Sequence, residues 1–440
     1  MGSYLALTES DRIEMLAALG MSRVEELFSQ IPEQVKIKNL DIPKGISEIE
    51  LVRSFSSMAA ENKIFPHIFR GAGAYKHYIP AAVKRITSNE TFITAYTPYQ
   101  AEISQGILQS IFEYQSMICE LTGMDVSNAS VYDGGSAAAE AMNMCRDRNR
   151  NTVFVSAMAH PQIIQTISTY CMGYGIQVEI IPAGKDGLSC MDSLNKLLKE
   201  SGKNSAGVYI QNPNFYGLIE DVAAFADITH NAGALLVNGV NPISLGIMES
   251  PGVLGADIAV GEGQPLGMSL AFGGPYLGFM AVKSPLMRKM PGRIIGETTD
   301  SKGERAFVLT LQAREQHIRR EKASSNICSN QAHCALTAAV YMAVMGEEGF
   351  AEAARQCHAK AVYAAAKISE LPGFAMVYGG EFFNEFVTRC PDSTKTLKKL
   401  EEHGILGGYP VSNTELLWCL TEANTKEEID TLTAILGEEK

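Results

Sequence analysis

The sequence of 440 residues has few features that mark secreted or membrane proteins. Its nine cysteines are scattered and form no CxxC pair, which is typical of reduced thiols and not of a disulfide framework. No window approaches about 18 uninterrupted apolar residues, the length of a membrane-spanning helix. The acidic residues Glu9 and Asp11 near the start also disfavour a secretory signal peptide. We therefore expect a cytoplasmic protein.

Positive charge is also scarce. Lysine and arginine number 37 against 49 aspartates and glutamates, so the formal net charge is -12 at pH 7. A negative balance of this size opposes nonspecific attraction to nucleic acid and to anionic membranes. We expect neither as a partner.

Paired metal ligands are missing as well. The closest approach is NICSNQAHCAL, which contains Cys328, His333 and Cys334. We predict that these residues lie in an apolar helix, and their spacing lacks the paired pattern of structural metal sites. The sequence therefore predicts no metal site.

The composition that remains is that of a globular protein, with 46% hydrophobic and 20% charged residues. The length suits one large domain with smaller additions. We predict an N-terminal helical arm over residues 1–65, a large α/β domain over 66–315 and a small α+β domain over 316–440. A helix capped at Thr8 or Ser10 opens the arm, and Thr425 and Glu428 have the spacing of a capping box at the start of a helix in the small domain.

Short apolar runs alternate with helical patterns in the predicted large domain. Continuous apolar runs of this kind suit strands that are covered on both faces, and the alternation predicts a mainly parallel, doubly wound sheet. Ligands of such sheets bind beyond the carboxyl ends of the strands. The predicted strands span residues 151–157, 176–183, 206–214, 233–240, 256–263 and 276–282.

One candidate anion site precedes an alanine-rich helix in VYDGGSAAAEAMNMC. Gly134, Gly135 and Ser136 stand where free backbone N–H groups and the helix dipole favour a negative charge. A phosphate would fit such a turn. An ordinary glycine turn capped by the serine is the alternative, and both interpretations stay open.

Two further positions lack the chemistry that this sheet carries in pyridoxal-phosphate enzymes. There a carboxylate pairs with the ring nitrogen after one strand, and this chain has Asn238 at that place. The position expected for the lysine that holds the cofactor falls at Gln264 and Pro265, and no lysine occurs between Lys203 and Lys283. The joint loss predicts a catalytically silent copy, with the lysine on another chain.

Two long strings resemble a known family: TAYTPYQAEISQGILQSIFEYQSMICELTGMDVSNASVYDGGSAAAEA at 94–141 and REQHIRREKASSNICSNQ at 314–331. They are similar to glycine decarboxylase, the P-protein of the glycine cleavage system, and within it to subunit 1 of the two-subunit form or the amino-terminal half of the fused form. The similarity covers essentially the whole chain. It implies the type I pyridoxal-phosphate fold, which is aspartate aminotransferase-like.

The resemblance also implies a function. In that family subunit 2 carries the lysine and the ring-pairing aspartate, so it would hold pyridoxal phosphate covalently while this chain does not. With subunit 2, the complex would decarboxylate glycine and transfer the aminomethyl group to the lipoyl arm of the H-protein. The chain would then be a subunit of glycine dehydrogenase (aminomethyl-transferring, decarboxylating) that is inactive alone.

Type I active sites lie between two such sheets, so a silent subunit can supply side chains to its partner. The resemblance makes Tyr96 and Tyr99 the first candidates, because a phenol donates to carboxylate or phosphate oxygens. Gln100 and Glu102 are weaker candidates. Two buried aromatics that only pack at the interface are the alternative.

The string REQHIRREK adds Arg314, His317 and Arg319 as weaker candidates for reaching an anionic group. We predict a helix here, on which Arg314 and His317 share a face and Glu315 pairs with Arg319. A solvated charged face is the alternative.

Two other functions remain open. The chain could be a structural or regulatory scaffold for subunit 2 that contributes nothing to the active site. It could also be a self-sufficient enzyme that uses Lys283, although that residue follows the strand over 276–282 and not the one over 256–263.

Overall fold

The computed structural model describes residues 7–37, 41–95 and 97–438. The chain divides into two compact units, Met1–Ile64 and Phe65–Lys440. Within the first unit, helix α1 (Glu9–Ala18) begins at Thr8, which forms a capping box with Asp11. Thr8, and not Ser10, is therefore the cap. The 3-10 turns η1 (Val24–Phe28) and η2 (Glu33–Val35) and helix α2 (Glu48–Ala60) follow.

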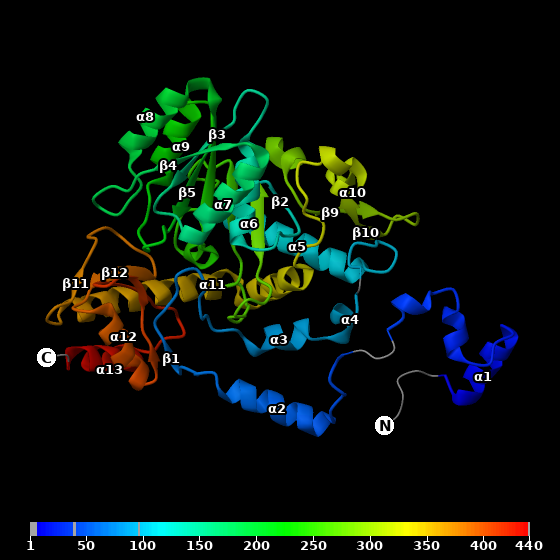
Figure 1. Cartoon of the computed structure of the whole chain (residues 1–440). Coiled ribbons are helices and arrows are strands. Elements are labelled where there is room, and N and C mark those ends of the chain that lie inside the picture. The colour runs from blue at the N-terminus through cyan, green and yellow to red at the C-terminus, as the bar shows by residue number, and fades with distance from the viewer. Residues whose placement is uncertain (1–6, 38–40, 96, 439–440) are drawn as a thin grey trace. The chain divides into compact units, whose positions relative to one another are not determined.

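A seven-stranded sheet forms the centre of the second unit, in the order β2-β8-β7-β6-β5-β3-β4 (Figure 1). Strands β4, β3, β5, β6 and β7 run parallel to their neighbours, whereas β8 is antiparallel to both β7 and β2. All six predicted strands are present. The strands are β2 (Val126–Ser127), β3 (Thr152–Ser156), β4 (Gln177–Ile181), β5 (Ser205–Asn212), β6 (Leu235–Val240), β7 (Ile258–Glu262) and β8 (Gly278–Val282).

Each face of the sheet buries its own apolar core. Leu236 and Ile210 on one face pack with Tyr341 of the long helix α11, and Val237 on the other face packs with the alanines of α6. Successive side chains of a strand point to opposite faces, so residues 236 and 237 enter different cores. The helices around the sheet are α5 (Gln105–Thr122), α6 (Gly134–Cys145), α7 (Pro161–Tyr174), α8 (Met191–Ser201), α9 (Val222–Asn231) and α11 (Ala332–Ser369), with the turns η3 (Gly202–Asn204) and η4 (Pro242–Gly246).

Helix α6 packs very closely against the sheet because its residues are small. Ala137, Ala138 and Ala139 are fully buried. At the first turn, a Cβ added to Gly134 would lie 2.9 Å from the backbone nitrogen of Glu262, at the end of β7. Only glycine therefore allows this end of the helix to approach β7.

The segment between the sheet and α11 differs from its prediction. An antiparallel pair, β9 (Ile294–Thr299) and β10 (Arg305–Thr310), follows the turn η5 (Ser284–Lys289), and this hairpin was not predicted. The predicted helix over REQHIRREK is wrong. The turn η6 (Gln312–Arg314), the short helix α10 (Gln316–Arg319) and the turn η7 (Arg320–Lys322) stand in its place.

The break in this helix occurs at two residues. Glu315 has an extended backbone, with ψ 153°, and Arg320 has a φ of 52°. Arg314 and His317 therefore do not share a helical face. The predicted apolar helix at Cys328 is also displaced, because α11 begins at Ala332 and Cys328 is exposed before it.

The chain ends in an α+β arrangement. Helix α11 extends from the central sheet to this part of the chain, where it contacts β12 and α13 (Figure 1). The predicted capping box of Thr425 and Glu428 is present at α13. The sheet order is β11-β12-β15-β14, and the elements are β11 (Ala375–Met376), β12 (Glu385–Arg389), α12 (Ser393–Glu402), β14 (Tyr409–Ser412), β15 (Glu415–Cys419) and α13 (Lys426–Gly437).

The second unit begins with a short strand and two short helices. Strand β1 (His67–Ile68) pairs in parallel with β13 (Ile405–Leu406), and helices α3 (Ala81–Thr87) and α4 (Glu90–Ile93) follow it. Among the described residues, no helix combines the length and the apolar character needed to cross a membrane.

Candidate functional site

A cavity of about 360 Å³ lies at the predicted place, beyond the carboxyl ends of β5, β6 and β7. Gly134 and Gly135 at the start of α6 form one wall, and His160, the N-cap of α7, forms another. Pro265 follows β7, and residues 72–75 close the cavity on the side of the small sheet. The parallel sheet therefore keeps the ligand-binding geometry of its fold.

The anion cup at the start of α6 is filled by the chain's own carboxylates. The Gly134 N–H donates to Glu262 Oε2 at 3.0 Å. The other carboxylate oxygen of Glu262 accepts from the N–H groups of Gln264 at 2.9 Å and Leu277 at 3.0 Å. Burial raises the pKa of Glu262. The position that would bind a phosphate thus holds a protein carboxylate.

The cap of α6 is Asp133, whose Oδ1 accepts from the Ser136 N–H at 2.7 Å. The alternative of a serine cap is therefore wrong, because Ser136 takes part through its backbone and not as the capping side chain. Aspartate at this position stabilises the helix by hydrogen bonding and by its charge at the positive end of the dipole.

The positions of the missing ring partner and lysine hold buried amides and a proline. Asn238 donates from Nδ2 to the Ile210 carbonyl at 3.0 Å, while its buried Oδ1 has no hydrogen-bond partner in the part of the chain that the structure describes. Gln264 accepts from the Tyr75 N–H and donates to the Tyr75 carbonyl, both at 2.9 Å. The loop that would carry a lysine therefore ties residues 72–75 to the sheet.

This cavity does not fit pyridoxal phosphate. Pro265 offers no amine, and the described residues that line the cavity include Asp133, Glu262 and Glu385 but neither lysine nor arginine. A phosphate in the cup would lie beside the Glu262 carboxylate. Two like unit charges 4 Å apart repel by about 4 kcal/mol at an effective dielectric constant of 20, which disfavours the anionic cofactor.

The wall opposite α6 is a hydrogen-bonded group that the sequence analysis missed. Glu385 accepts from the Ala72 N–H and from the Tyr75 hydroxyl, both at 2.7 Å. His160 Nδ1 accepts from the Gln162 N–H, so Nε2 is the nitrogen that donates to the Ala72 carbonyl at 3.0 Å. Burial lowers the pKa of His160, in agreement with a neutral ring. His160 lies shortly after the end of β3. The expectation that ligands bind beyond the carboxyl ends of parallel strands could therefore have identified it from the sequence.

Replacement of Glu385 by glutamine is expected to change how stability depends on pH. Burial raises the pKa of Glu385 to about 7 from 4.5. Between these values the folded protein holds a proton that the unfolded chain has lost, so stability falls as pH rises, by about 3 kcal/mol in total. Glu385→Gln removes this slope. Denaturant unfolding at pH 5 and pH 8 measures it.

The matched control is Glu427→Gln, which changes an exposed carboxylate on α13. This variant should keep the slope of the parent protein. A Glu385→Gln profile parallel to that of the parent would contradict the assignment of a protonated, buried carboxyl group.

A second group forms around Tyr99, here called the Tyr99 cluster. The Tyr99 hydroxyl donates to Asn330 Oδ1, and the Arg293 guanidinium lies over the Tyr99 ring, 4.3 Å from its centre. Glu315 Oε2 lies 3.7 Å from Arg293 Nη1 and 3.2 Å from His317 Nδ1. Burial raises the pKa of Tyr99. The cluster therefore links two predicted residues, Tyr99 and His317, through an ion-paired arginine.

The other predicted residues lie outside this cluster. Tyr96 falls outside the described residues. Gln100 and Glu102 are exposed, and Arg319 donates from Nε to the Ala313 carbonyl at 3.0 Å. Sequence analysis missed Arg293, whose only local signal is its place after a Pro-Gly pair and before β9.

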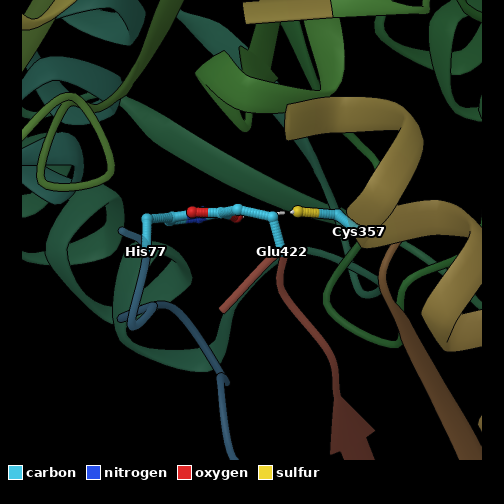
Figure 2. A group of neighbouring side chains, drawn as sticks. All are labelled: His77, Cys357 and Glu422. Carbon is cyan, nitrogen blue, oxygen red and sulfur yellow. Dashed lines mark hydrogen bonds and ion pairs between the residues drawn. The ribbon is translucent and has the colours of Figure 1, made fainter. Parts of the chain in front are cut away.

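A third group contains His77, Cys357 and Glu422 (Figure 2). His77 Nδ1 donates to Glu422 Oε2 at 2.7 Å, and the Cys357 thiol donates to the same oxygen at 3.2 Å. Burial and the charge of Glu422 raise the pKa of Cys357 well above its usual value. The ligand atoms could surround a cation, but Nδ1, the thiol and Oε2 already bond to one another, and the protonated thiol is not a nucleophile. The other ring nitrogen of His77, Nε2, is buried without a hydrogen-bond partner among the described residues.

The chain matches the family model "Glycine cleavage system P-protein" over residues 2–436. It is 49% identical over 443 residues to a protein of Moorella thermoacetica named probable glycine dehydrogenase (decarboxylating) subunit 1, with 99% of each chain covered. A protein of Carboxydothermus hydrogenoformans with the same name is 49% identical over 444 residues, again with 99% of each chain covered.

Solved structures agree with this match. A crystal structure of glycine decarboxylase (P-protein) of the glycine cleavage system, in inhibitor-bound form, has a TM-score of 0.92 at 39% identity and covers 99% of this chain and 100% of that one. A C-DES mutant with glycine covalently linked to its PLP cofactor has a TM-score of 0.63 at 15% identity over 87% of this chain and 98% of that one, which shows the shared type I fold. The chain belongs to the family of glycine cleavage system P-proteins.

Proposed function

We propose that this chain is subunit 1 of a two-subunit glycine decarboxylase and has no autonomous chemistry. With subunit 2 it decarboxylates glycine on pyridoxal phosphate and transfers the aminomethyl group to the lipoyl arm of the H-protein. The names of the most similar relatives support this assignment. A cytoplasmic location and the division into an arm and two domains remain predictions.

The observation that carries the proposal is the Glu262 carboxylate in the anion cup, together with Pro265 in the lysine loop. The chain keeps the fold of the family, but a protein carboxylate occupies the position where the cofactor phosphate would bind. Such a cavity is suited to structural support and not to cofactor binding. The covalently bound cofactor therefore belongs to the partner subunit.

The proposed contribution of this chain to the partner's site is the Tyr99 cluster. Four of its polar side chains, from four separate segments, are held together by an ion pair, a cation–π contact and a hydrogen bond. Because Tyr99 bonds to Asn330 of its own chain, we assign it a positioning role. Tyr96, Gln100, Glu102, Arg314 and Arg319 stay as weaker proposals.

Tyr99→Phe in the reconstituted complex is expected to lower kcat about fivefold with KM for glycine little changed. Loss of one hydrogen bond costs about 1 kcal/mol, which corresponds to a rate change of about fivefold. Tyr363→Phe is the matched control. It removes a tyrosine hydroxyl on α11 that donates to Asp430 on α13 at 2.6 Å. Tyr363→Phe should therefore retain the full activity of the parent complex.

The competing function is a scaffold that stabilises subunit 2 and contributes nothing to its active site. Under that hypothesis Tyr99→Phe and the double change of Tyr96 and Tyr99 to phenylalanine both leave kcat unchanged while the complex stays intact. Gel filtration of each variant with subunit 2 establishes that the complex has formed before rates are compared.

A further inference from the structure

A second cavity, of about 290 Å³, is lined mainly by cations. It is called the basic cavity here. Four short segments between β8 and α11 supply its walls, and none of the described residues that line it is acidic. The lining residues are Arg288, Leu311, Ala313, Arg314, Arg319, Lys322 and Ser324.

Two of the arginines are held in place by backbone carbonyls. Arg314 donates from Nε to the Leu311 carbonyl at 3.1 Å and from Nη2 to the Gly292 carbonyl at 2.9 Å. Arg319 donates from Nε to the Ala313 carbonyl at 3.0 Å. A carbonyl orients a guanidinium without neutralising its charge, so the cavity keeps preoriented positive groups with free N–H donors.

Arg314 also carries an unused donor. Its Nη1 is buried and has no hydrogen-bond partner among the described residues. Burial lowers the pKa of Arg314, which reflects the cost of holding this charge away from water. A buried guanidinium N–H without an acceptor is unfavourable, and an oxyanion in the cavity would satisfy it.

No ion pair of the chain holds these cations. Among the described residues, none of Arg288, Arg314, Arg319 and Lys322 forms one. The charge of Glu315 partly offsets the lowering of the Arg314 pKa by burial, but the ion pairs of Glu315 are with Arg293 and His317. This is notable in a chain whose net charge is -12. Like charges brought together without a counter-charge repel one another, so the arrangement favours an external anion.

We propose that the basic cavity binds a phosphate group, as free phosphate or as a small phosphate monoester. Planar guanidinium groups match phosphate oxygens in paired hydrogen bonds, and a lysine adds a point charge. The volume is close to the lower end of ligand pockets and suits a small molecule. The site is separate from the cofactor-like cavity and does not depend on the decarboxylase assignment.

Calorimetric titration of the full chain, alone and with subunit 2, tests the site. The probes are inorganic phosphate and glycerol 3-phosphate at fixed chloride concentration. Saturable binding of either probe is expected. A dissociation constant for glycerol 3-phosphate as low as that for inorganic phosphate indicates that the cavity accepts a phosphate monoester. Arg319→Gln combined with Lys322→Gln changes two exposed side chains and should weaken binding at least tenfold.

The matched control combines Arg85→Gln with Lys398→Gln, which removes the same two charges from exposed positions on α3 and α12. It should bind both probes as the parent does. Absence of saturable binding to the parent protein, or equal weakening in the two double variants, would overturn the proposal, because only a general charge effect would then remain.

Discussion

Glycine–bicarbonate exchange is expected only when this chain is mixed with subunit 2 in the presence of pyridoxal phosphate. The isolated chain should show neither exchange nor the visible absorbance of a lysine-bound cofactor. The physical reason is electronic. Pro265 offers no amine to fix the cofactor, and the amide of Asn238 offers no charge to keep its ring protonated.

The measurement compares three samples at equal protein concentration: this chain, subunit 2 and their mixture. Exchange of labelled bicarbonate into glycine reports decarboxylation, and borohydride reduction followed by mass spectrometry locates the cofactor. Covalent cofactor on this chain, for example at Lys283, would remove the basis of the proposed function.

A lysine introduced at Pro265 is expected to be insufficient for cofactor binding. In Pro265→Lys the Glu262 carboxylate still occupies the cup at the Gly134 N–H. Adding Glu262→Ala to that variant frees the N–H groups and removes the like charge. The repulsion of about 4 kcal/mol estimated for close unit charges corresponds to roughly a thousandfold difference in affinity for pyridoxal phosphate.

Spectroscopic titration of the two variants with pyridoxal phosphate measures this difference. The control combines Pro265→Lys with Glu140→Gln, which neutralises a buried carboxyl group on α6 that bonds to Ser325 and does not line the cavity. Equal affinity in Pro265→Lys with and without Glu262→Ala would show that the carboxylate does not block the phosphate position.

Much of the fold followed from the sequence because strand and helix periodicities are local. The six predicted strands, the cap at Thr8 and the capping box at Thr425 depend on residues close together in the chain. The hairpin β9–β10 was missed although its two strands are neighbours in the chain, whereas the broken helix at Glu315 depends on Arg293, which lies before β9. Glu315 takes an extended backbone where its carboxylate pairs with Arg293, which overrides the local helical pattern.

The sequence by itself determined the sheet, the place of its cavity and the absence of a lysine there, since each depends on residue type and local order. Only the tertiary structure decided what fills the anion cup. Glu262 lies 128 positions from Gly134 in the chain, and the parallel sheet brings them to hydrogen-bonding distance. The contact between Tyr99 and Arg293 likewise joins two segments that are far apart in the chain. It depends on how the sheet and α11 pack, which local sequence patterns do not specify.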